Sequence, residues 1–378
     1  MQNQIEAAVA LYSSGQFKIA LKKVKGLVIE YPNEAILFNL SGACYSALSD
    51  FENAAKSYRE ALSINQNYVE VHNSLGVCLQ NIGNLEGAVS SYKNAIALSP
   101  NFAEAHNNLG NTYKELKQLD SAIGCYKKSI AIKPNFAYPY YNLGLIFHNQ
   151  NELLKAIQNY EKAIQINPNY FEAHNNLGGA LQYFGKMNLA VDSYKRAIEI
   201  KPNFVDAYIN LGIILTELGR LSEAEISLKQ AISISPKSAK ALNHIGNTYK
   251  DLGRINDAEL SYRKAIQLEL DYANAYNNLG IILYASGNID SSIESLEKAH
   301  LISSESSLLL SVIRSKKLQQ KSGSKETKIL SASDRLANNP LILNRKVENE
   351  LIDTLYEIKA IELDEVRDPG YGNAKGSD

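Results

Sequence analysis

Amide side chains recur in this sequence at a fixed interval, and they are its best candidates for binding chemistry. An asparagine amide both donates and accepts hydrogen bonds, so a row of amides suits a polar, extended ligand such as a peptide main chain. Contacts of this kind bind without requiring one ligand sequence. The members of one row lie 34 residues apart, or twice that number. They are Asn108, Asn142, Asn176, Asn210 and Asn278.

Further polar and apolar residues share this spacing. The position before the row repeats asparagine at Asn107, Asn175, Asn243 and Asn277. Three positions after the row, Asn111 and Asn247 alternate with the apolar Val77, Leu145, Ile213 and Ile281. Four positions before it lie the acidic Glu70, Glu104, Glu172 and Asp206, which suit basic or polar side chains of a partner.

Residues typical of catalysis or metal binding do not form a site. His72, His106 and His174 recur at the same repeat position, which predicts packing and hydrogen bonding, because ligands one repeat apart do not converge on a metal. Cys44, Cys78 and Cys125 form no CxxC pair. Cys44 and Cys78 share one repeat position and are expected to be small buried apolar groups, and Cys125 has no obvious histidine partner. We find no phosphate-binding loop, no GxSxG and no HExxH motif. The sequence predicts no catalytic residue, no metal and no cofactor, so the chain is not expected to be an enzyme.

Composition restricts the class of protein. The chain has 378 residues, a net charge of −1, 45% hydrophobic and 21% charged residues, which is ordinary globular usage. Residues 1–306 carry 27 basic and 29 acidic residues, which disfavours nucleic acid as a partner. No apolar run approaches the ~18 residues of a membrane span, and the N-terminus lacks the pattern of a signal peptide. We expect a soluble cytoplasmic protein that binds proteins or peptides rather than membranes.

The spacing reflects nine blocks of equal length without insertion or deletion. Within a block, apolar residues recur at helical intervals, which predicts two helices joined by a turn that often has glycine at position 15. Small residues at positions 8 and 20 let the helices approach, a tyrosine at 24 fills the space, and proline at 32 ends the second helix. The blocks are 1–34, 35–68, 69–102, 103–136, 137–170, 171–204, 205–238, 239–272 and 273–306.

This block pattern resembles the tetratricopeptide repeat family over residues 1–306. The resemblance implies an all-α, right-handed superhelical solenoid whose first helices line a concave face, and a protein-interaction scaffold as the function. It places the asparagines at position 6 in the inner groove, where they are similar to the asparagine ladder in the repeat domain of O-GlcNAc transferase. The alternative is that these asparagines belong to the scaffold, since asparagine is common at this position across the family.

Residues after the blocks are of a different kind. We expect a capping helix at 307–320, a flexible linker at 321–342, and an amphipathic helix with a loose tail at 343–378. The apolar stripe of 343–361 needs a partner surface to cover it. Self-association of the chain through this segment is one option. The ending RDPGYGNAKGSD resembles a junction in marine bacterial and phage proteins where such repeats precede a 2-oxoglutarate-oxygenase-like domain. The alternative function is therefore an N-terminal recognition module of a glycosyltransferase or such an oxygenase, and the alternative for the ending is an ordinary C-terminus.

Overall fold

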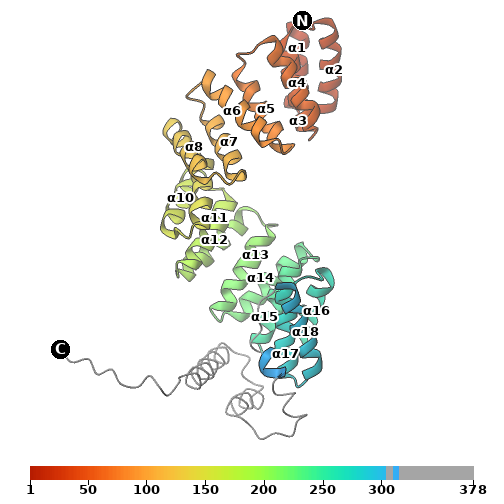
Figure 1. The fold of residues 1–378 in the computed structure, drawn as a ribbon, viewed down its shortest axis with the longest axis vertical. Coiled ribbons are helices and arrows are strands. Elements are labelled where there is room, and N and C mark those ends of the chain that lie inside the picture. The colour runs from red at the N-terminus through yellow and green to blue at the C-terminus, as the bar shows by residue number, and fades with distance from the viewer. Residues whose placement is uncertain (304–309, 315–378) are drawn as a thin grey trace, which may run out of the picture. The chain divides into compact units, whose positions relative to one another are not determined.

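The computed structural model describes residues 1–303 and 310–314, and this part of the chain is helical, without a strand (Figure 1). The linker and tail expected at 321–342 and 343–378 lie outside the described residues, as does most of the capping segment expected at 307–320.

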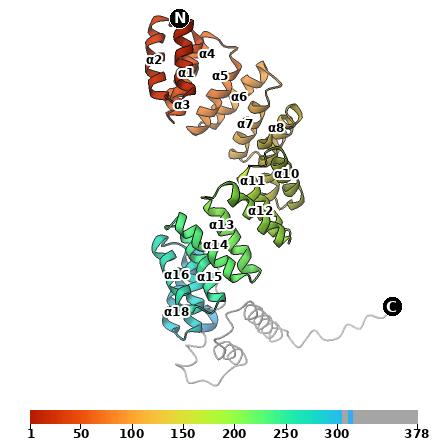
Figure 2. The same cartoon turned by 180° about the vertical axis from the view of Figure 1, so that it is seen from behind.

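Each sequence block holds two helices (Figures 1 and 2). The first helices are α1 (Gln2–Ser13), α3 (Ala35–Ala47), α5 (Val69–Asn81), α7 (Ala103–Glu115), α9 (Ala137–Asn149), α11 (Phe171–Tyr183), α13 (Val205–Glu217), α15 (Ala239–Asp251) and α17 (Ala273–Ala285). The second helices are α2 (Phe17–Glu30), α4 (Phe51–Ile64), α6 (Leu85–Leu98), α8 (Leu119–Ile132), α10 (Leu153–Ile166), α12 (Met187–Ile200), α14 (Leu221–Ile234), α16 (Ile255–Leu268) and α18 (Ile289–Ser303).

The chain divides into two compact units, the first from Met1 to Gly185 and the second starting at Lys186. Within each unit, every helix packs against the next one along the chain. First helices of successive blocks also touch, as α7 touches α9 in the first unit and α13 touches α15 in the second. This nearest-neighbour packing is typical of a solenoid, and it confirms the all-α repeat fold predicted from the sequence.

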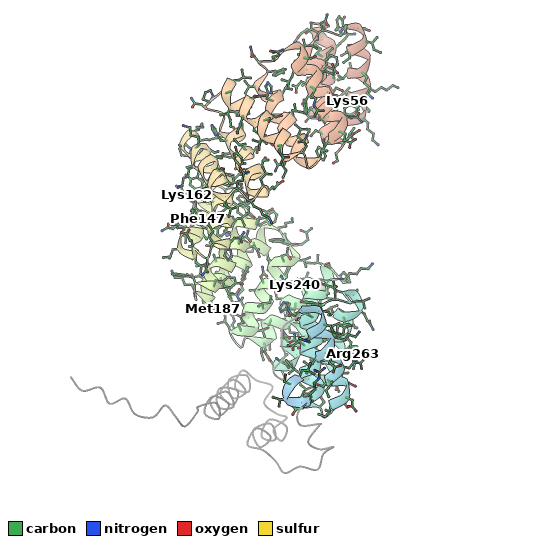
Figure 3. The ribbon with its side chains drawn as sticks, in the orientation of Figure 1. Lys56, Phe147, Lys162, Met187, Lys240 and Arg263 are labelled. Atoms are coloured by element: carbon green, nitrogen blue, oxygen red, sulfur yellow. The ribbon has the colours of Figure 1, made fainter. Side chains whose placement is uncertain are left out.

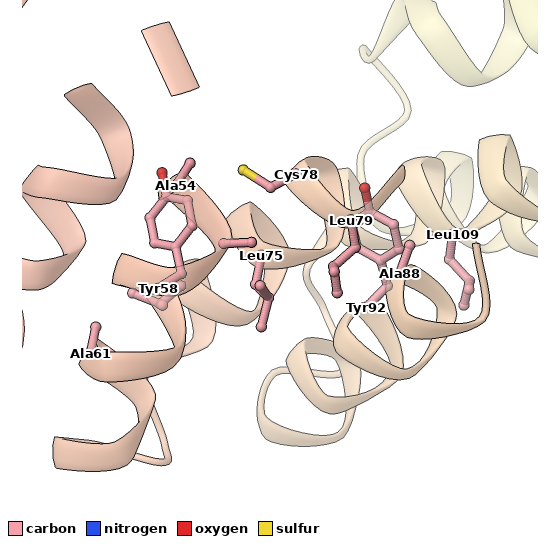
Figure 4. Packing of buried hydrophobic residues seen from close by; sticks show 11 residues of the cluster. Ala54, Tyr58, Ala61, Leu75, Cys78, Leu79, Ala88, Tyr92 and Leu109 are labelled. Atoms are coloured by element: carbon pink, nitrogen blue, oxygen red, sulfur yellow. The ribbon is translucent and has the colours of Figure 1, made fainter. Parts of the chain in front are cut away.

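Most helix pairs are held by a glycine at position 8 that faces a large side chain at position 24. A Cβ atom added to Gly76 would lie 2.6 Å from Cε1 of Tyr92, and one added to Gly212 would lie 2.4 Å from Cγ of Leu228. Figure 4 shows Tyr58 and Tyr92 in the apolar core of the first unit. The close approach predicted for the two helices is confirmed, since only glycine leaves room for the ring.

The turn between the two helices requires a left-handed residue at position 15. Gly83 has a φ of 85°, and its N–H and that of Asn84 donate to the carbonyls of Gln80 and Leu79, which closes the end of α5. Glycine fills this position in six blocks, from Gly15 to Gly287, with φ between 71° and 85°. Ser49, Lys117 and Asn151 hold the same left-handed conformation without being glycine, with φ between 59° and 61°.

Past the last block, the described residues 310–314 are helical and lie against α18. Leu310 and Ile313 are buried with Leu296, and Arg314 pairs with Glu297 at 2.6 Å. These residues cover the apolar end of α18. They belong to the segment predicted to be a capping helix, whose full extent stays a prediction.

Candidate functional site

Four of the five asparagines at position 6 donate a hydrogen bond to position 5 of the preceding repeat. Asn142 Nδ2 donates to Asn107 Oδ1 at 3.3 Å in the first unit, and Asn278 Nδ2 donates to Asn243 Oδ1 at 3.0 Å in the second. Both bonds join consecutive first helices. The asparagine row therefore links neighbouring repeats.

Position 5 needs a hydrogen-bond acceptor but not an amide. Asn108 Nδ2 donates to Asn73 Oδ1 at 3.1 Å, whereas Asn176 Nδ2 donates to the hydroxyl of Tyr141 at 2.9 Å. A tyrosine hydroxyl accepts as an amide oxygen does, so the same link survives a change of side chain.

Neighbouring asparagines of one helix also contact each other. Asn107 Nδ2 donates to Asn108 Oδ1 at 3.4 Å, and Asn175 Nδ2 donates to Asn176 Oδ1 at 3.3 Å. Together with the bonds between repeats, these contacts form a polar network along the first helices. We call it the asparagine ladder, made by the residues at positions 5 and 6 of successive first helices.

Exposure divides the predicted groove residues into two groups. The side chains of Asn107, Asn142 and Asn243 are buried, at 6%, 8% and 2% exposure, so they serve mainly to hold repeats together. The others are partly buried and keep one side toward solvent; they are Asn108, Asn111, Asn175, Asn176, Asn210, Asn247, Asn277 and Asn278. The scaffold role that the sequence left open is thus present in the structure, alongside amides that a ligand can reach.

Asparagines at position 9 connect the ladder to the core. The hydroxyl of Tyr126 donates to Asn111 Oδ1 at 2.8 Å, and the hydroxyl of Tyr262 donates to Asn247 Oδ1 at 2.7 Å. Asn247 also accepts from Asn278 Nδ2 at 3.1 Å. These bonds fix the orientation of the position 9 amides, which lie on the same side of the first helices as the ladder.

A pocket of about 250 Å³ opens between α13 and α15 in the second unit. Burial and, second, the charge of Lys240 lower the pKa of His244 to about 4, so its imidazole is neutral at pH 7. The pocket carries carboxylates and an ammonium group as well as an apolar residue. Its lining is Ile213, Thr216, Glu217, His244, Asn247, Lys250 and Asp251.

Sequence reasoning missed positions 12 and 13, which supply four of these lining residues. A signal was present: the string Asn-Thr-Tyr-Lys followed by an acid occurs at 111–115 and again at 247–251. In both copies the threonine, buried at position 10, bonds to position 12 of the preceding repeat. Thr112 Oγ1 donates to Gln80 Oε1 at 3.2 Å, and the Oγ1 atoms of Thr248 and Thr216 lie 2.9 Å apart.

The histidines at position 4 have a structural role, as expected. Nε2 of His106 and His174 lies 3.1 Å from the carbonyl oxygens of Pro100 and Pro168, and Nε2 of His72 lies 2.9 Å from that of Gln66. Each ring thus binds the loop that leads into its own helix. In the part of the chain that the structure describes, no group of three or more His, Cys, Asp or Glu side chains is arranged to hold a metal ion.

The cysteines are apolar packing groups. Cys44 and Cys78 are buried, and burial raises the pKa of both thiols. Burial also raises the pKa of Cys125 to about 11, although nearby Lys93 lowers it slightly. All three thiols are protonated at neutral pH, and a protonated thiol is a poor nucleophile.

None of the described helices has the length and apolar composition needed to cross a membrane. The second helices expose charged side chains to solvent, among them Lys56, Lys162 and Arg263 (Figure 3).

Solved structures that are similar to this chain include several repeat proteins. MamA is 32% identical over 43% of this chain and 94% of its own, with a TM-score of 0.39. YrrB, described as a TPR protein with an unusual peptide-binding site, is 23% identical over 50% of this chain and 97% of its own, with a TM-score of 0.42. A chain of the APC/C hetero-tetramer Cut9-Hcn1 is 15% identical, and the match covers 71% of this chain and 52% of that one, with a TM-score of 0.54. No curated protein matches the chain.

Family models describe most of the sequence. The TPR repeat model matches residues 42–83, 81–117, 110–151, 145–182, 184–219 and 246–287, and two further tetratricopeptide repeat models match 205–238 and 273–305. Solenoids of this type present extended surfaces to other proteins, which supports a protein-interaction scaffold. The matched models, the helix pairs and their stacking together show that this chain belongs to the tetratricopeptide repeat family.

Proposed function

We propose that the first-helix face binds extended segments of partner proteins. This face consists of the side chains at block positions 2, 5, 6, 9, 12 and 13 of the first helices. The observation that carries the proposal is the pocket between α13 and α15, because every residue that lines it comes from positions 6, 9, 12 or 13. A pocket built only from this face is a place for a side chain of a ligand that runs along it.

The ladder leaves hydrogen-bonding capacity for a peptide main chain. A side-chain amide has two N–H donors and two acceptor lone pairs. Asn108 gives one N–H to Asn73 and accepts once from Asn107, and its side chain is only partly buried. Half of its capacity is therefore left for a ligand. The bonds to neighbouring repeats also hold the amide in place, which lowers the entropy lost on binding.

Ligand preference follows from the side chains around the ladder. Acids at position 2 and the mixed amides and apolar residues at position 9 favour segments that alternate polar or basic residues with apolar ones. In the second unit, Glu217, Lys250 and Asp251 give the pocket charges of both signs. A polar or charged side chain of the partner fits this pocket better than an apolar one. We propose that this scaffold acts in the cytoplasm, without catalysis of its own.

The test replaces one residue of the face and compares it with a matched residue outside the face. Ile213→Lys places a long cation at the mouth of the pocket, whereas Ile226→Lys makes the same change at a side chain of α14 that is 70% exposed. Peptides selected from a random library by the full chain serve as the probe. We expect Ile213→Lys to weaken their binding about tenfold or more, equal to ~1.4 kcal/mol, and Ile226→Lys to leave it unchanged. Equal peptide affinity of the Ile213→Lys and Ile226→Lys variants would contradict the proposal.

Replacing Asn142, Asn176 and Asn210 by alanine is a less direct test than the sequence suggests. Asn142 and Asn176 bond to the preceding repeat, so their loss lowers stability as well as binding. The triple variant should therefore be read together with its circular dichroism and its urea unfolding midpoint. Weaker binding at an unchanged midpoint supports the groove, and unchanged binding contradicts it.

The second proposal, a recognition module of a glycosyltransferase or 2-oxoglutarate oxygenase, is supported by the sequence of 343–378 alone. Those residues lie outside the described part of the chain. The intact mass of the endogenous product tests it. A mass well above 41.8 kDa supports a further domain, and a mass of 41.8 kDa leaves the scaffold by itself.

A further inference from the structure

A second pocket lies on the other side of the helix pairs, between α6 and α8, with α7 as its floor. Its volume is about 500 Å³, within the range of about 300–1,000 Å³ found for ligand sites. We call it the α6–α8 pocket. Its lining is Lys93, Ile96 and Ala97 of α6, His106, Leu109 and Tyr113 of α7, and Ser121, Gly124, Cys125 and Lys128 of α8.

One of the lining residues is a glycine, Gly124, at position 22 of its block. This glycine lies inside α8, where glycine costs about 0.5–1 kcal/mol relative to alanine. No close packing requires it, because a Cβ added to Gly124 would meet nothing within 4 Å. The second helices on either side have larger residues there, Ser90 on α6 and Gln158 on α10. At Gly124 the α8 side of the pocket therefore carries no side chain.

The lining sets the chemistry of the occupant. Leu109 is buried, and Ile96, Tyr113 and Cys125 are partly buried, so the floor is apolar. The protonated thiol of Cys125 adds no charge. Two ammonium groups stand beside this floor.

Lys93 and Lys128 are exposed, and neither forms an ion pair with any described residue. An apolar surface flanked by two unpaired cations fits a helix with an apolar stripe and acidic neighbours. Charge complementarity thus favours an acidic amphipathic segment as the partner.

This chain contains such a segment at 343–361. Its apolar stripe consists of Val347, Leu351, Leu355 and Ile358. The middle of the segment, 348–358, carries four acids and no base, and its three bases lie at its two ends: Arg345, Lys346 and Lys359. An amphipathic helix gains most of its stability from a surface that covers its apolar face. The apolar stripe is complementary to the apolar floor of the pocket, and the acids of the segment are opposite in charge to Lys93 and Lys128.

We propose that the α6–α8 pocket of one molecule binds the 343–361 segment of a second copy of the chain. The pocket and the segment are different surfaces, so the contact is heterologous and continues from copy to copy. Association then produces a series of species that grow with concentration rather than a single closed dimer. This inference is independent of ligand binding at the first-helix face.

Filling the pocket tests the proposal. Gly124→Leu puts a large side chain into the pocket, and the Cβ atom of that side chain would meet nothing within 4 Å. Gly26→Leu is the matched control, since Gly26 lies inside α2 and its Cβ would also meet nothing within 4 Å. The readout is the mass of the full chain by light scattering over a concentration series.

We expect the wild type and Gly26→Leu to associate alike, and Gly124→Leu to need about tenfold higher concentration. A wild type that stays monomeric, or a Gly124→Leu variant that associates like the wild type, would overturn the proposal. Neither result changes the outcome of the peptide test at Ile213. Failure of self-association can therefore be distinguished from failure of peptide binding at the first-helix face.

Charge reversal provides a second, independent arm. Lys93→Glu with Lys128→Glu places acids opposite the acids of the segment, and association should weaken. Adding Glu350→Lys and Glu357→Lys should restore it, because opposite charges face each other again. Weakening without restoration would mean that the segment does not bind beside these lysines, and would contradict the proposal.

Discussion

Repeats four (103–136) and five (137–170) share one way of packing their two helices but differ in the polar contacts of the tyrosine at position 24. In both, the ring at position 24 covers the glycine at position 8. In repeat four the hydroxyl of Tyr126 donates to Asn111, whereas the buried hydroxyl of Tyr160 in repeat five has no partner among the described residues. The difference arises because Leu145 stands where Asn111 would be.

Repeat five adds contacts between aromatic rings around Tyr160. The ring of Tyr141 lies 4.8 Å from that of Tyr170 and 6.0 Å from that of Tyr160, and the ring of His148 lies 6.5 Å from Tyr160. Aromatic pairs at such distances contribute about 0.5–1.5 kcal/mol beyond their burial. Glycine at position 8 and tyrosine at position 24 thus set the helix pair in both repeats, while the residue at position 9 varies and changes the polarity of the first-helix face.

The largest effect should come from the shared contact. Gly110→Ala and Gly144→Ala each force a Cβ to within 2.6 and 2.5 Å of a tyrosine ring carbon. We expect each to lower the free energy of unfolding by about 1–3 kcal/mol, as overpacking does. Urea unfolding gives the overall loss, and hydrogen exchange of α7 to α10 locates it.

Gly124→Ala is the control for this pair, because its Cβ meets nothing within 4 Å and the helix should gain about 0.5–1 kcal/mol. A loss in only one of the two repeats would show that they do not share a packing scheme.

An effect of opposite sign should distinguish the two tyrosines. Tyr126→Phe removes a hydrogen bond of 2.8 Å and should cost about 1 kcal/mol of unfolding free energy. Tyr160→Phe removes a buried hydroxyl for which the described residues offer no partner, and should gain about 1 kcal/mol. Leu145→Asn sharpens the result: in that background, Tyr160→Phe should become destabilising, as in repeat four. Equal losses for both single variants would refute the difference between the repeats.

The smallest effect concerns the turn at position 15. Lys117 and Asn151 both have left-handed backbones, with φ of 59° and 60°. Asparagine tolerates this conformation better than lysine does. Lys117→Gly should therefore raise the unfolding free energy by about 0.5–1 kcal/mol, and Asn151→Gly should change it little. The urea midpoints of the two variants, measured side by side, decide the matter; a larger gain at Asn151 would be against expectation.

The fold was predictable because the signals lie within one block. Gly42 and Tyr58 belong to one helix pair, as do Gly76 and Tyr92, and the same arrangement recurs in most of the other described pairs. Such contacts follow from the helical spacing of one repeat and need no knowledge of the next repeat.

The candidate site was less predictable because it depends on how repeats stack. The bond from Asn142 to Asn107 and the contact of Thr248 with Thr216 join different repeats, and the sequence of one block does not show which positions meet. The α6–α8 pocket was missed for a related reason. One of its lining residues, Gly124, is a departure from the neighbouring repeats rather than a shared feature.

The asparagine ladder also bears on how such a gene can change in length. Each rung joins position 6 of one repeat to position 5 of the one before, as Asn278 does to Asn243. Duplication or loss of one whole block length, wherever the break falls, preserves the register of every remaining rung. A recombination event of any other size would misalign the amides at the junction. The protein can therefore be lengthened or shortened in whole steps, and each step adds or removes one unit of binding surface.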